Sequence, residues 1–584
     1  MKHTVMSKSI ILISSLLAIS TAGEIDIRNN TGLSDNELKA VQIPIRESGG
    51  TYIQAKANEG HIPLGKINTA KLPRSNAKVA NTILTALSKA YQKSGFYATR
   101  FVMLPKDYKR ASSTGSDLAI YVQEKRVKKV KVTLDKQFKD GLQSFWKGTK
   151  ERIEKVVKPQ IAGLLQPKKF QNNIDLLNRH PRRHIQPLIQ VDKNKDLLVE
   201  YKVRELKPYQ FHVFANNYGP ESIGELRYGV HADFYNLANL DGHYFMGYTT
   251  SENSVSQGAY VGGKIAVDKL QRQKIGFTAS HSSYQISELG SQLGVSLLSD
   301  GEKLTGSATS FNLNYTHNIY AQDKLFVDFV IGAEWMNVKS DRSALAGSNA
   351  ELFDLETNYL LPQIGFTAGK IEQNQWWNTA LNLKFNLPGV AGTAEDIGTD
   401  IELSRFGRFG AENDFTLLTF SGAYTKLLAQ RKHQFDTKWS ATQNLTGNRL
   451  PANFLTVLGD GQTLRGYPTA VVSGDSGAFA TLEYKYNVTN LFDGGNAKVS
   501  SSVETDKLSV KAFVDVGAIQ TEDKLATEKD EFLSSVGIGV DWNYQSNLSL
   551  TSSLGMPLQS VDLGVSDSVE KGSVRFNVGI NFSF

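Results

Sequence analysis

The stretch Val574-Arg575-Phe576-Asn577-Val578-Gly579-Ile580-Asn581-Phe582-Ser583-Phe584, at the end of a sequence of 584 residues, alternates between apolar and polar or small side chains. Successive side chains of a strand point to opposite faces, so one face of this strand carries only Val, Ile and Phe. An apolar face rich in aromatic residues, backed by a polar face, suits lipid on one side and water on the other. A sheet in lipid must close on itself, because open edges would leave N–H and C=O groups unpaired in hydrocarbon. The stretch therefore predicts an all-β transmembrane barrel.

Segments of the same kind recur upstream and predict the size of the barrel. From residue 207 to the end, about sixteen alternating segments follow one another with turn signals between them, as in outer-membrane barrels. A barrel of about sixteen antiparallel strands encloses a lumen wide enough for water, so its polar inner face needs no apolar filling. The segments are expected to begin near Tyr209, Glu225, Gly242, Gly258, Lys274, Thr309, Lys324, Asn358, Gln375, Asp414, His433, Gly477, Lys507, Glu531, Leu548 and Gly572.

The N-terminus has the features of a secretory signal peptide. Met1-Lys2-His3 and Lys8 are followed by a short apolar run and by Ser20-Thr21-Ala22, which predicts cleavage after Ala22. No later stretch supplies the roughly 20 apolar residues that a membrane-spanning helix needs, which excludes a helical membrane protein. The chain has no Cys, and this excludes disulfides, thiolate nucleophiles and Cys-ligated metals. The His residues show no constellation of partners, so we expect no catalytic, cofactor-binding or metal site and no enzyme activity.

Between the signal peptide and the barrel, the pattern of strands and helices predicts two small α+β domains, residues 23–124 and 125–206. Such modules offer sheet edges to extended peptides. In the first we expect a capping box from Ser34 to Glu37, a loop over Gln42–Asn68, and a polar loop between two strands. The expected elements of the two domains are strand Ile25–Asn30, helix Ser75–Lys93, strands Phe96–Leu104 and Ser116–Glu124, a strand from Val127, helices Lys150–Leu165 and Lys168–Asn178, and strands Ile185–Val191 and Asp196–Arg204.

Basic residues gather in the second of these domains. A nucleic-acid patch and a solvated face are the two interpretations. The signal peptide sends the chain away from nucleic acid, so the solvated face is expected and no nucleic-acid partner is. The net charge of +7 permits acidic partners without establishing one. The residues concerned are Lys125–Lys131, Lys168, Lys169, Arg179, Arg182 and Arg183.

A long loop, residues 458–476, joins the eleventh and twelfth barrel segments and contains Gly461-Gln462-Thr463-Leu464-Arg465-Gly466-Tyr467. Two glycines around a cation indicate backbone packed closely against a surface, with Arg465 directed at a planar acceptor. The alternation of Phe513-Val514-Asp515-Val516-Gly517 directs Asp515 into the lumen. We therefore expect the loop to fold inward and Arg465 to pair with Asp515, with Glu483 as a second acceptor. A solvated loop, and an Asp515 that merely faces water, are the alternatives.

These motifs together resemble the two-partner secretion transporters, the hemolysin and filamentous-adhesin secretion/activation family (TpsB type) of POTRA-plus-barrel outer-membrane proteins. The resemblance rests on the motif Gln462–Tyr467 followed by Ser473–Gly477, and on Phe513–Gly517 and the terminal Phe584. Further stretches resemble the ends of two POTRA domains and a first barrel hairpin: Gly95–Arg100 with Leu104-Pro105, Leu176–Arg179, and Asn216–Gly219 with Gly224–Arg227.

The resemblance implies an exporter in the bacterial outer membrane with its N-terminal domains in the periplasm. Its partners would be a secreted, TpsA-like exoprotein in extended form, the barrel assembly machinery and the lipid bilayer. It implies a loop–lumen latch made of Leu464, Arg465, Gly466, Tyr467, Asp515 and Gly517, and a barrel assembly signal made of Phe576, Phe582 and Phe584.

Two departures from the family pattern stand out. Almost nothing separates Ala22 from the first strand at Ile25, which leaves no room there for the plug helix that the family usually carries. The stretch Arg182-Arg183-His184 is more basic than usual, which we interpret as a feature of a particular partner.

Three rival functions remain open from the sequence. An assembly factor that inserts other barrels shares the loop motif but normally has more POTRA domains. A passive porin does not need a large periplasmic region. An outer-membrane hydrolase would need a catalytic constellation, which the sequence does not show.

Overall fold

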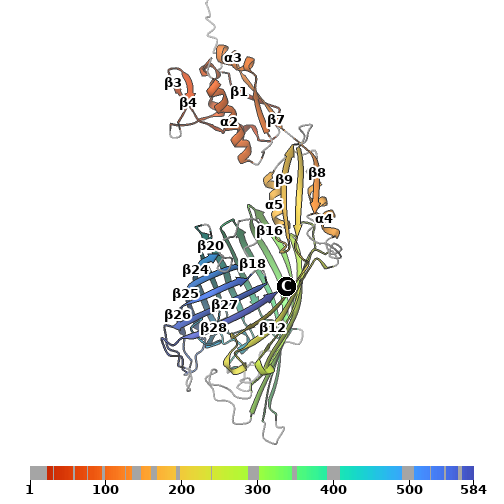
Figure 1. Ribbon diagram of the computed structural model, residues 1–584, viewed down its shortest axis with the longest axis vertical. Coiled ribbons are helices and arrows are strands. Elements are labelled where there is room, and N and C mark those ends of the chain that lie inside the picture. The colour runs from red at the N-terminus through yellow and green to blue at the C-terminus, as the bar shows by residue number, and fades with distance from the viewer. Residues whose placement is uncertain are drawn as a thin grey trace, which may run out of the picture. The chain divides into compact units, whose positions relative to one another are not determined.

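The computed structural model describes residues 23–30, 32–56, 59–74, 77–94, 96, 99–124, 126–134, 147–158, 167–191, 197–237, 240–286, 302–344, 351–390, 408, 410–429, 431–489, 506–526, 528–544, 547–562 and 568–584 (Figure 1). The chain divides into two compact units. Unit 1 comprises residues 1–131, 157–171 and 187–201, and unit 2 comprises 132–156, 172–186 and 202–584. The predicted signal peptide lies outside the described residues.

Unit 1 contains a three-stranded sheet of order β1-β7-β6, in which β1 runs parallel to β7. Helix α2 buries Val79, Ile83, Leu87 and Tyr91, which recur on one face of the helix and belong to a single hydrophobic core. The predicted capping box of α1 is confirmed, since Ser34 and Glu37 each accept the other's backbone N–H. The elements are β1 (Ile25–Arg28), α1 (Asp35–Lys39), α2 (Ala77–Lys93), β6 (Thr99–Met103), α3 (Pro105–Thr114) and β7 (Leu118–Glu124).

Two loop predictions in unit 1 are wrong. The stretch Gln42–Asn68 contains two small antiparallel ribbons, and their strands are too short to show a period of two in the sequence. The polar stretch between β6 and β7 is helix α3, which starts with Pro105 in its first turn and ends at Gly115 in the left-handed region (φ 67°). The ribbons are β2 (Gln42–Ile43) with β5 (Ile62–Pro63) and β3 (Ile45–Ser48) with β4 (Thr51–Gln54), followed by 3₁₀ turns η1 (Leu64–Lys66) and η2 (Thr69–Lys71).

A second three-stranded sheet has the order β8-β10-β9, and two helices separate β8 from β9 along the chain. This strand, two helices, two strands order is the one that the sequence predicts. The elements are β8 (Val127–Leu134), α4 (Lys147–Val157), α5 (Pro167–Leu177), β9 (Arg183–Val191) and β10 (Leu197–Glu205). The domain boundaries at 124/125 and 206/207 stay predictions.

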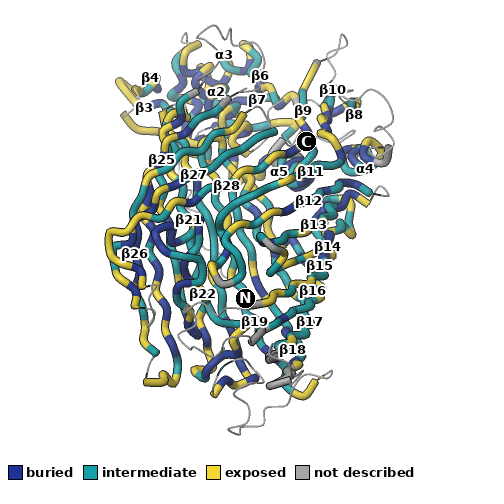
Figure 2. Tube along the Cα trace, turned by 60° about the horizontal axis from the view of Figure 1, so that its bottom comes forward, coloured by how far each residue is buried: buried dark blue, intermediate teal, exposed yellow. Residues whose placement is uncertain are grey.

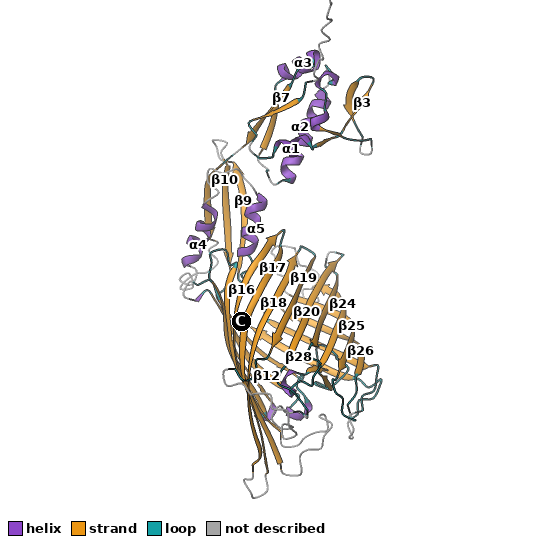
Figure 3. Cartoon of the chain, turned by 180° about the vertical axis from the view of Figure 1, so that it is seen from behind, coloured by secondary structure: helices purple, strands orange, loops and turns teal. Residues whose placement is uncertain are grey.

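Residues 209–583, all of them in unit 2, form a closed barrel of sixteen strands, in which consecutive strands pair and the last pairs with the first (Figure 3). The predicted fold class is confirmed, and each predicted segment corresponds to one strand. The strands are β11 (Tyr209–Asn216), β12 (Arg227–Tyr235), β13 (His243–Ser251), β14 (Ser256–Ala266), β15 (Gln273–Ile286), β16 (Glu302–Gln322), β17 (Leu325–Ala344), β18 (Glu351–Ile371), β19 (Gln375–Phe385), β20 (Thr416–Leu428), β21 (His433–Asn444), β24 (Ser476–Thr489), β25 (Asp506–Gln520), β26 (Glu531–Tyr544), β27 (Leu548–Pro557) and β28 (Arg575–Ser583).

The two faces of the barrel wall differ as the alternation predicts. On β25, Val514 is 45% exposed, whereas its inward neighbours Phe513 and Asp515 are buried. On β28, Phe576, Ile580 and Phe582 are exposed on the outer face while Asn577 is buried. Buried, intermediate and exposed residues follow one another along the strands (Figure 2). Within the described ranges, no helix combines the length and apolar character needed to cross a membrane.

Strands β11 and β28 close the barrel, and Phe584 belongs to this junction. The Phe584 N–H donates to the Phe211 carbonyl and the Phe211 N–H donates to the Phe584 carbonyl, both at 3.0 Å. The two rings stack with centroids 5.6 Å apart. Phe584 thus extends the closing ladder by one hydrogen-bonded pair and adds an aromatic contact on the outer face.

Deleting Phe584 is expected to lower the amount of inserted barrel severalfold, because both closing hydrogen bonds and the ring stack are lost. Phe584→Asn keeps the backbone pair and should lose less. The measurement is the heat-modifiable, membrane-inserted fraction on gels. Val574→Asn is the matched control, since Val574 is an exposed apolar residue that precedes β28. Wild-type levels of the deletion variant would contradict the prediction.

Candidate functional site

The loop between the eleventh and twelfth barrel strands folds into the lumen. Its two ends form a short ribbon, β22 (Thr456–Leu458) with β23 (Val472–Gly474). Between them, Leu464, Tyr467 and Val471 are buried in one cluster with Ile519 and Leu533 of the wall strands β25 and β26. The term inward loop is used below for residues 458–476.

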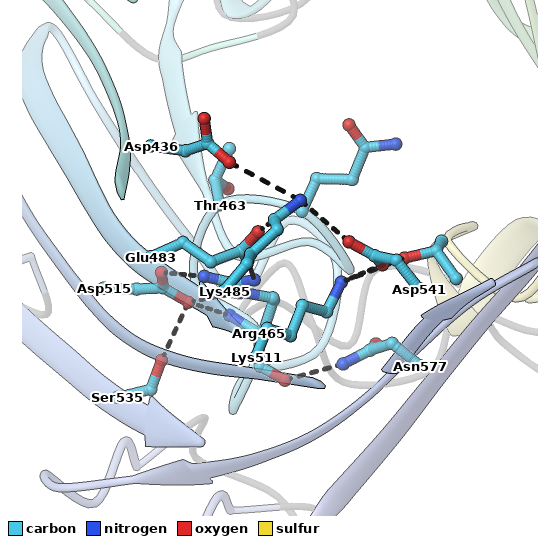
Figure 4. A network of polar contacts seen from close by, with 12 residues as sticks. Asp436, Thr463, Arg465, Glu483, Lys485, Lys511, Asp515, Ser535, Asp541 and Asn577 are labelled. Carbon is cyan, nitrogen blue, oxygen red and sulfur yellow. Dashed lines mark hydrogen bonds and ion pairs between the residues drawn. The ribbon is translucent and has the colours of Figure 1, made fainter. Parts of the chain in front are cut away.

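Arg465 is bound to the barrel wall by two carboxylates (Figure 4). Its Nε donates to Asp515 Oδ2 at 2.9 Å and its Nη2 to Asp515 Oδ1 at 2.7 Å, which makes a bidentate pair. Its Nη1 donates to Glu483, and its backbone N–H donates to Asp515 Oδ2 at 3.1 Å. The guanidinium carbon also lies 3.4 Å from the centroid of the Phe513 ring. Only a planar guanidinium can make these contacts at once.

The ion pair is removed from water. The side chain of Arg465 is 6% exposed, that of Asp515 is 0% exposed and that of Glu483 is 12% exposed. Removing one partner from a buried pair is costly, because the other charge stays buried without compensation.

The other predicted latch residues lie around Arg465. Leu464 fills the space where Gly517 has no side chain, since a Cβ at 517 would lie 2.8 Å from Leu464 Cδ1. Gly466 packs on the wall so closely that a Cβ there would lie 2.7 Å from Pro557 N. The Tyr467 hydroxyl lies 3.1 Å from the Ser534 carbonyl and accepts from the Gln559 N–H at 3.2 Å. The structure brings these residues together, and their role as a latch stays a proposal.

A chain of charges continues from this pair and was missed in the sequence. Lys485 Nζ lies 2.9 Å from Glu483 and 2.7 Å from Asp541, and Lys511 Nζ lies 2.6 Å from Asp541. Acidic and basic groups thus alternate along the inner wall (Figure 4). Lys485 and Lys511 share the inward face with Glu483 and Asp515, so strand alternation alone could have suggested them.

The basic corner between α5 and β9, which contains Arg179 and Arg183, is not a solvated face. The Arg183 side chain is fully buried and donates to Asp241 Oδ2 at 2.9 Å and to Glu205 Oε1 at 3.3 Å. Arg179 donates to Asp328 Oδ1 at 3.0 Å. The prediction of a solvated face is therefore wrong for Arg179 and Arg183, because acidic residues far along the chain pair with them. It holds for Lys128, Lys129 and Lys131, which are exposed. The interpretation of Arg182-Arg183-His184 as a feature of a particular partner stays a prediction.

Burial shapes the electrostatics of that corner. It raises the pKa of Glu205 to about 7, although the nearby Arg183 guanidinium acts in the opposite direction. For Asp241, burial is outweighed by Arg183, and the pKa lies below its usual range. The corner thus holds one carboxyl that titrates near neutral pH and one that stays ionised.

Some of the residues singled out in the sequence analysis are not described by the structure. Gly95, Tyr97 and Ala98, which belong to the stretch that resembles the end of a first POTRA domain, lie outside the described residues, as does Lys125 of the basic cluster.

The chain is similar to known proteins both in sequence and in fold. The family model described as "Haemolysin secretion/activation protein ShlB/FhaC/HecB" matches residues 196–542. Among solved structures, CdiB from Escherichia coli is similar with a TM-score of 0.66 at 15% identity, covering 98% of this chain and 93% of that one. CdiB from Acinetobacter baumannii is similar with a TM-score of 0.59 at 14% identity, covering 96% and 90%. No curated protein matches the sequence.

Proposed function

Since the chain belongs to the haemolysin secretion/activation family of two-partner secretion transporters in the bacterial outer membrane, we propose that it exports one partner exoprotein. The exoprotein would be captured unfolded in the periplasm and would pass through the barrel to the cell surface. The observation that carries the proposal is the inward loop, which is held in a closed sixteen-stranded lumen by a buried ion pair.

The α+β sheets support the capture step. Each has two edge strands, β1 and β6 in the first sheet and β8 and β9 in the second. An extended segment of an exoprotein can add to such an edge through main-chain hydrogen bonds, while its side chains enter flanking grooves. The N-terminal domains would therefore lie in the periplasm, where an unfolded partner arrives.

The lumen supports the conduction step. Its wall carries hydrogen-bonding and charged groups, which an extended polar chain can exchange for water. In the resting transporter, the inward loop would occupy this space, with the Arg465–Asp515 pair as the latch that holds it. Folding of the exoprotein outside would bias its movement outward, so the transporter needs no nucleotide.

Deletion of the gene tests the proposal against its main rival. We expect one exoprotein to disappear from the secreted proteome while the outer-membrane proteome stays unchanged. The control is complementation by the wild-type gene. Loss of many outer-membrane barrels would instead identify an assembly or insertion factor and would overturn the export function.

A further inference from the structure

The closing junction of the barrel, called the seam below, is shorter than the neighbouring strand pairs. Strand β11 pairs with β12 along its whole length, Tyr209–Asn216, but its pairing with β28 covers only His212–Asn216 and Gly579–Ser583. β28 nevertheless continues to Arg575, where it pairs with β27 on its other side. Toward Arg575, the seam therefore lacks a regular ladder.

A side chain replaces the missing ladder. Asn217 Nδ2 donates to the Phe576 carbonyl at 2.8 Å, and its Oδ1 accepts from the Val578 N–H at 2.8 Å. The Asn217 backbone N–H donates to the Val578 carbonyl at 3.2 Å. Arg575 adds an ion pair with Glu225. The Asn217 amide and the ion pairs of Arg575, with Glu225 and with Glu221 at 3.5 Å, thus extend the seam beyond its backbone pairing.

The inward loop contacts this same region from inside the barrel. Asn577 of β28 is buried, and its Nδ2 donates to the Arg465 carbonyl at 2.8 Å. Thr469 Oγ1 donates to the Tyr218 carbonyl, just beyond β11, at 3.0 Å. The latch residue Arg465 is therefore held from β28 as well as from its carboxylate partners.

The ring of Tyr218 lies against the loop and against β28. A Cβ at Gly461 of the loop would lie 2.2 Å from Tyr218 Cδ1, and a Cβ at Gly579 of β28 would lie 2.9 Å from the Tyr218 hydroxyl. Glycine at both positions permits this approach. The side chain fills the space between the loop and the last strand.

We propose that Asn577 and Tyr218 are positioning residues of the latch, and that docking of the inward loop and closure of the seam stabilise each other. The contacts that join loop and seam form only when both are in place, so loss of either weakens the other. The proposal rests on the latch role of the loop, but its readouts do not depend on secretion, so it can fail while the export function stands.

Loop position is measured with a cysteine reporter in the otherwise Cys-free full-length protein. Val471→Cys is suitable, because Val471 belongs to the inward loop and is buried in the cluster that the docked loop forms with the barrel wall. Asn577→Ala in this background should raise the rate of labelling by a maleimide in intact cells about fivefold or more, as expected for loss of one buried hydrogen bond. Asn577→Asp, which keeps the shape but cannot donate from its side chain, should behave in the same way.

Two matched variants separate positioning from general damage. Asn581→Ala changes another inward Asn of β28, four positions further along the strand, and should leave labelling at the wild-type rate. Tyr218→Ala should increase labelling, whereas Tyr218→Phe keeps the packed ring and should restore protection. Equal labelling of the Asn577→Ala and Asn581→Ala variants would overturn the positioning role.

The coupling between loop docking and seam closure is tested with a disulfide across the seam, which can be formed and reduced. His212 and Ser583 face each other at the seam beside the hydrogen-bonded pair Phe211–Phe584, so they form a non-hydrogen-bonded pair. Such a pair brings Cα atoms close enough for a disulfide. Asp515→Ala should lower the unfolding temperature of the His212→Cys/Ser583→Cys protein when it is reduced. Oxidation should remove most of that drop, and an equal drop in both states would overturn the coupling.

Discussion

Arg465→Ala is expected to abolish secretion, or to reduce it about a hundredfold, while the barrel still inserts. The guanidinium neutralises Asp515, whose side chain is 0% exposed, and one-sided removal of a buried ion pair costs about 3–5 kcal/mol. Each 1.4 kcal/mol changes a population ratio tenfold, so a cost of about 3 kcal/mol lowers the ratio of docked to undocked loop by roughly a hundredfold. The measurement is the exoprotein in culture medium, normalised to heat-modifiable transporter.

The structure also ranks the variants at this site. Asp515→Ala should come close to Arg465→Ala in effect, because Arg465 then keeps only Glu483. Glu483→Ala should be milder, since both oxygens of Asp515 still pair with Arg465. Equal effects of all three variants would contradict the assignment of Asp515 as the main acceptor.

A matched control uses another inward ion pair. Lys384 of β19 lies 2.9 Å from Glu334 of β17, and neither strand pairs with β24 or β25, which carry Glu483 and Asp515, so Lys384→Ala should secrete normally. A charge swap, Arg465→Asp with Asp515→Arg, tests direct contact. It requires Glu483→Gln as well, because Glu483 would otherwise face a second carboxylate. Full secretion by Arg465→Ala would reduce the motif to an ordinary loop.

Removal of residues 23–124 is expected to leave an inserted barrel that secretes no exoprotein. All residues of the first hydrophobic core lie within this range, and no barrel strand is interrupted by the deletion. The effect should be complete if capture depends on this domain. It is measured as secreted exoprotein against heat-modifiable barrel in the same cells. Persistent secretion would place capture elsewhere in the chain.

A pair of substitutions on one helix gives the same test without a deletion. Leu87→Asp places a charge in the fully buried core beneath α2 and should reproduce the loss of secretion. Gln92→Asp adds the same charge at an exposed position of the same helix and should secrete normally. Loss of secretion in both variants would point to the added charge rather than to folding of the domain.

The barrel could be predicted from the sequence because lipid imposes a period of two on every spanning strand. The predicted starts of β16 and β18, Thr309 and Asn358, nevertheless lie inside strands that begin at Glu302 and Glu351. The added residues carry charged side chains on both faces, such as Glu302 and Lys303 of β16 and Glu351 and Asp354 of β18, so the alternation is less clear there. The predicted pairing partners of Arg465 followed from the same rule, since alternation decides which carboxylates face the lumen.

Contacts between distant parts of the chain could not be predicted in this way. Nothing local to Arg183 reveals Asp241, and nothing near Asn577 reveals the carbonyl of Arg465. Helix α3 is a different case, because the sequence does mark its ends: Pro105 indicates its start and Gly115 its end. The polar residues between them favoured a loop instead. The contact of Asn577 with Arg465 depends on closure of the barrel and on the inward loop, which bring together segments remote in the sequence.

The length of three strands has a consequence for the direction in which a chain would leave the pore. β16 and β18 have 21 residues each and β17 has 20, whereas a bilayer is crossed by about 9–11 strand residues. About half of this three-stranded sheet therefore stands beyond the hydrocarbon, while β11–β13 and β28 have far fewer residues to spare (Figure 3). A polypeptide emerging at this end of the barrel would meet the projecting strands β16–β18 on one side and the shorter strands β11–β13 and β28 on the other. It would be deflected sideways, and the first folded part of the exoprotein would form off the pore axis, over the short-stranded flank.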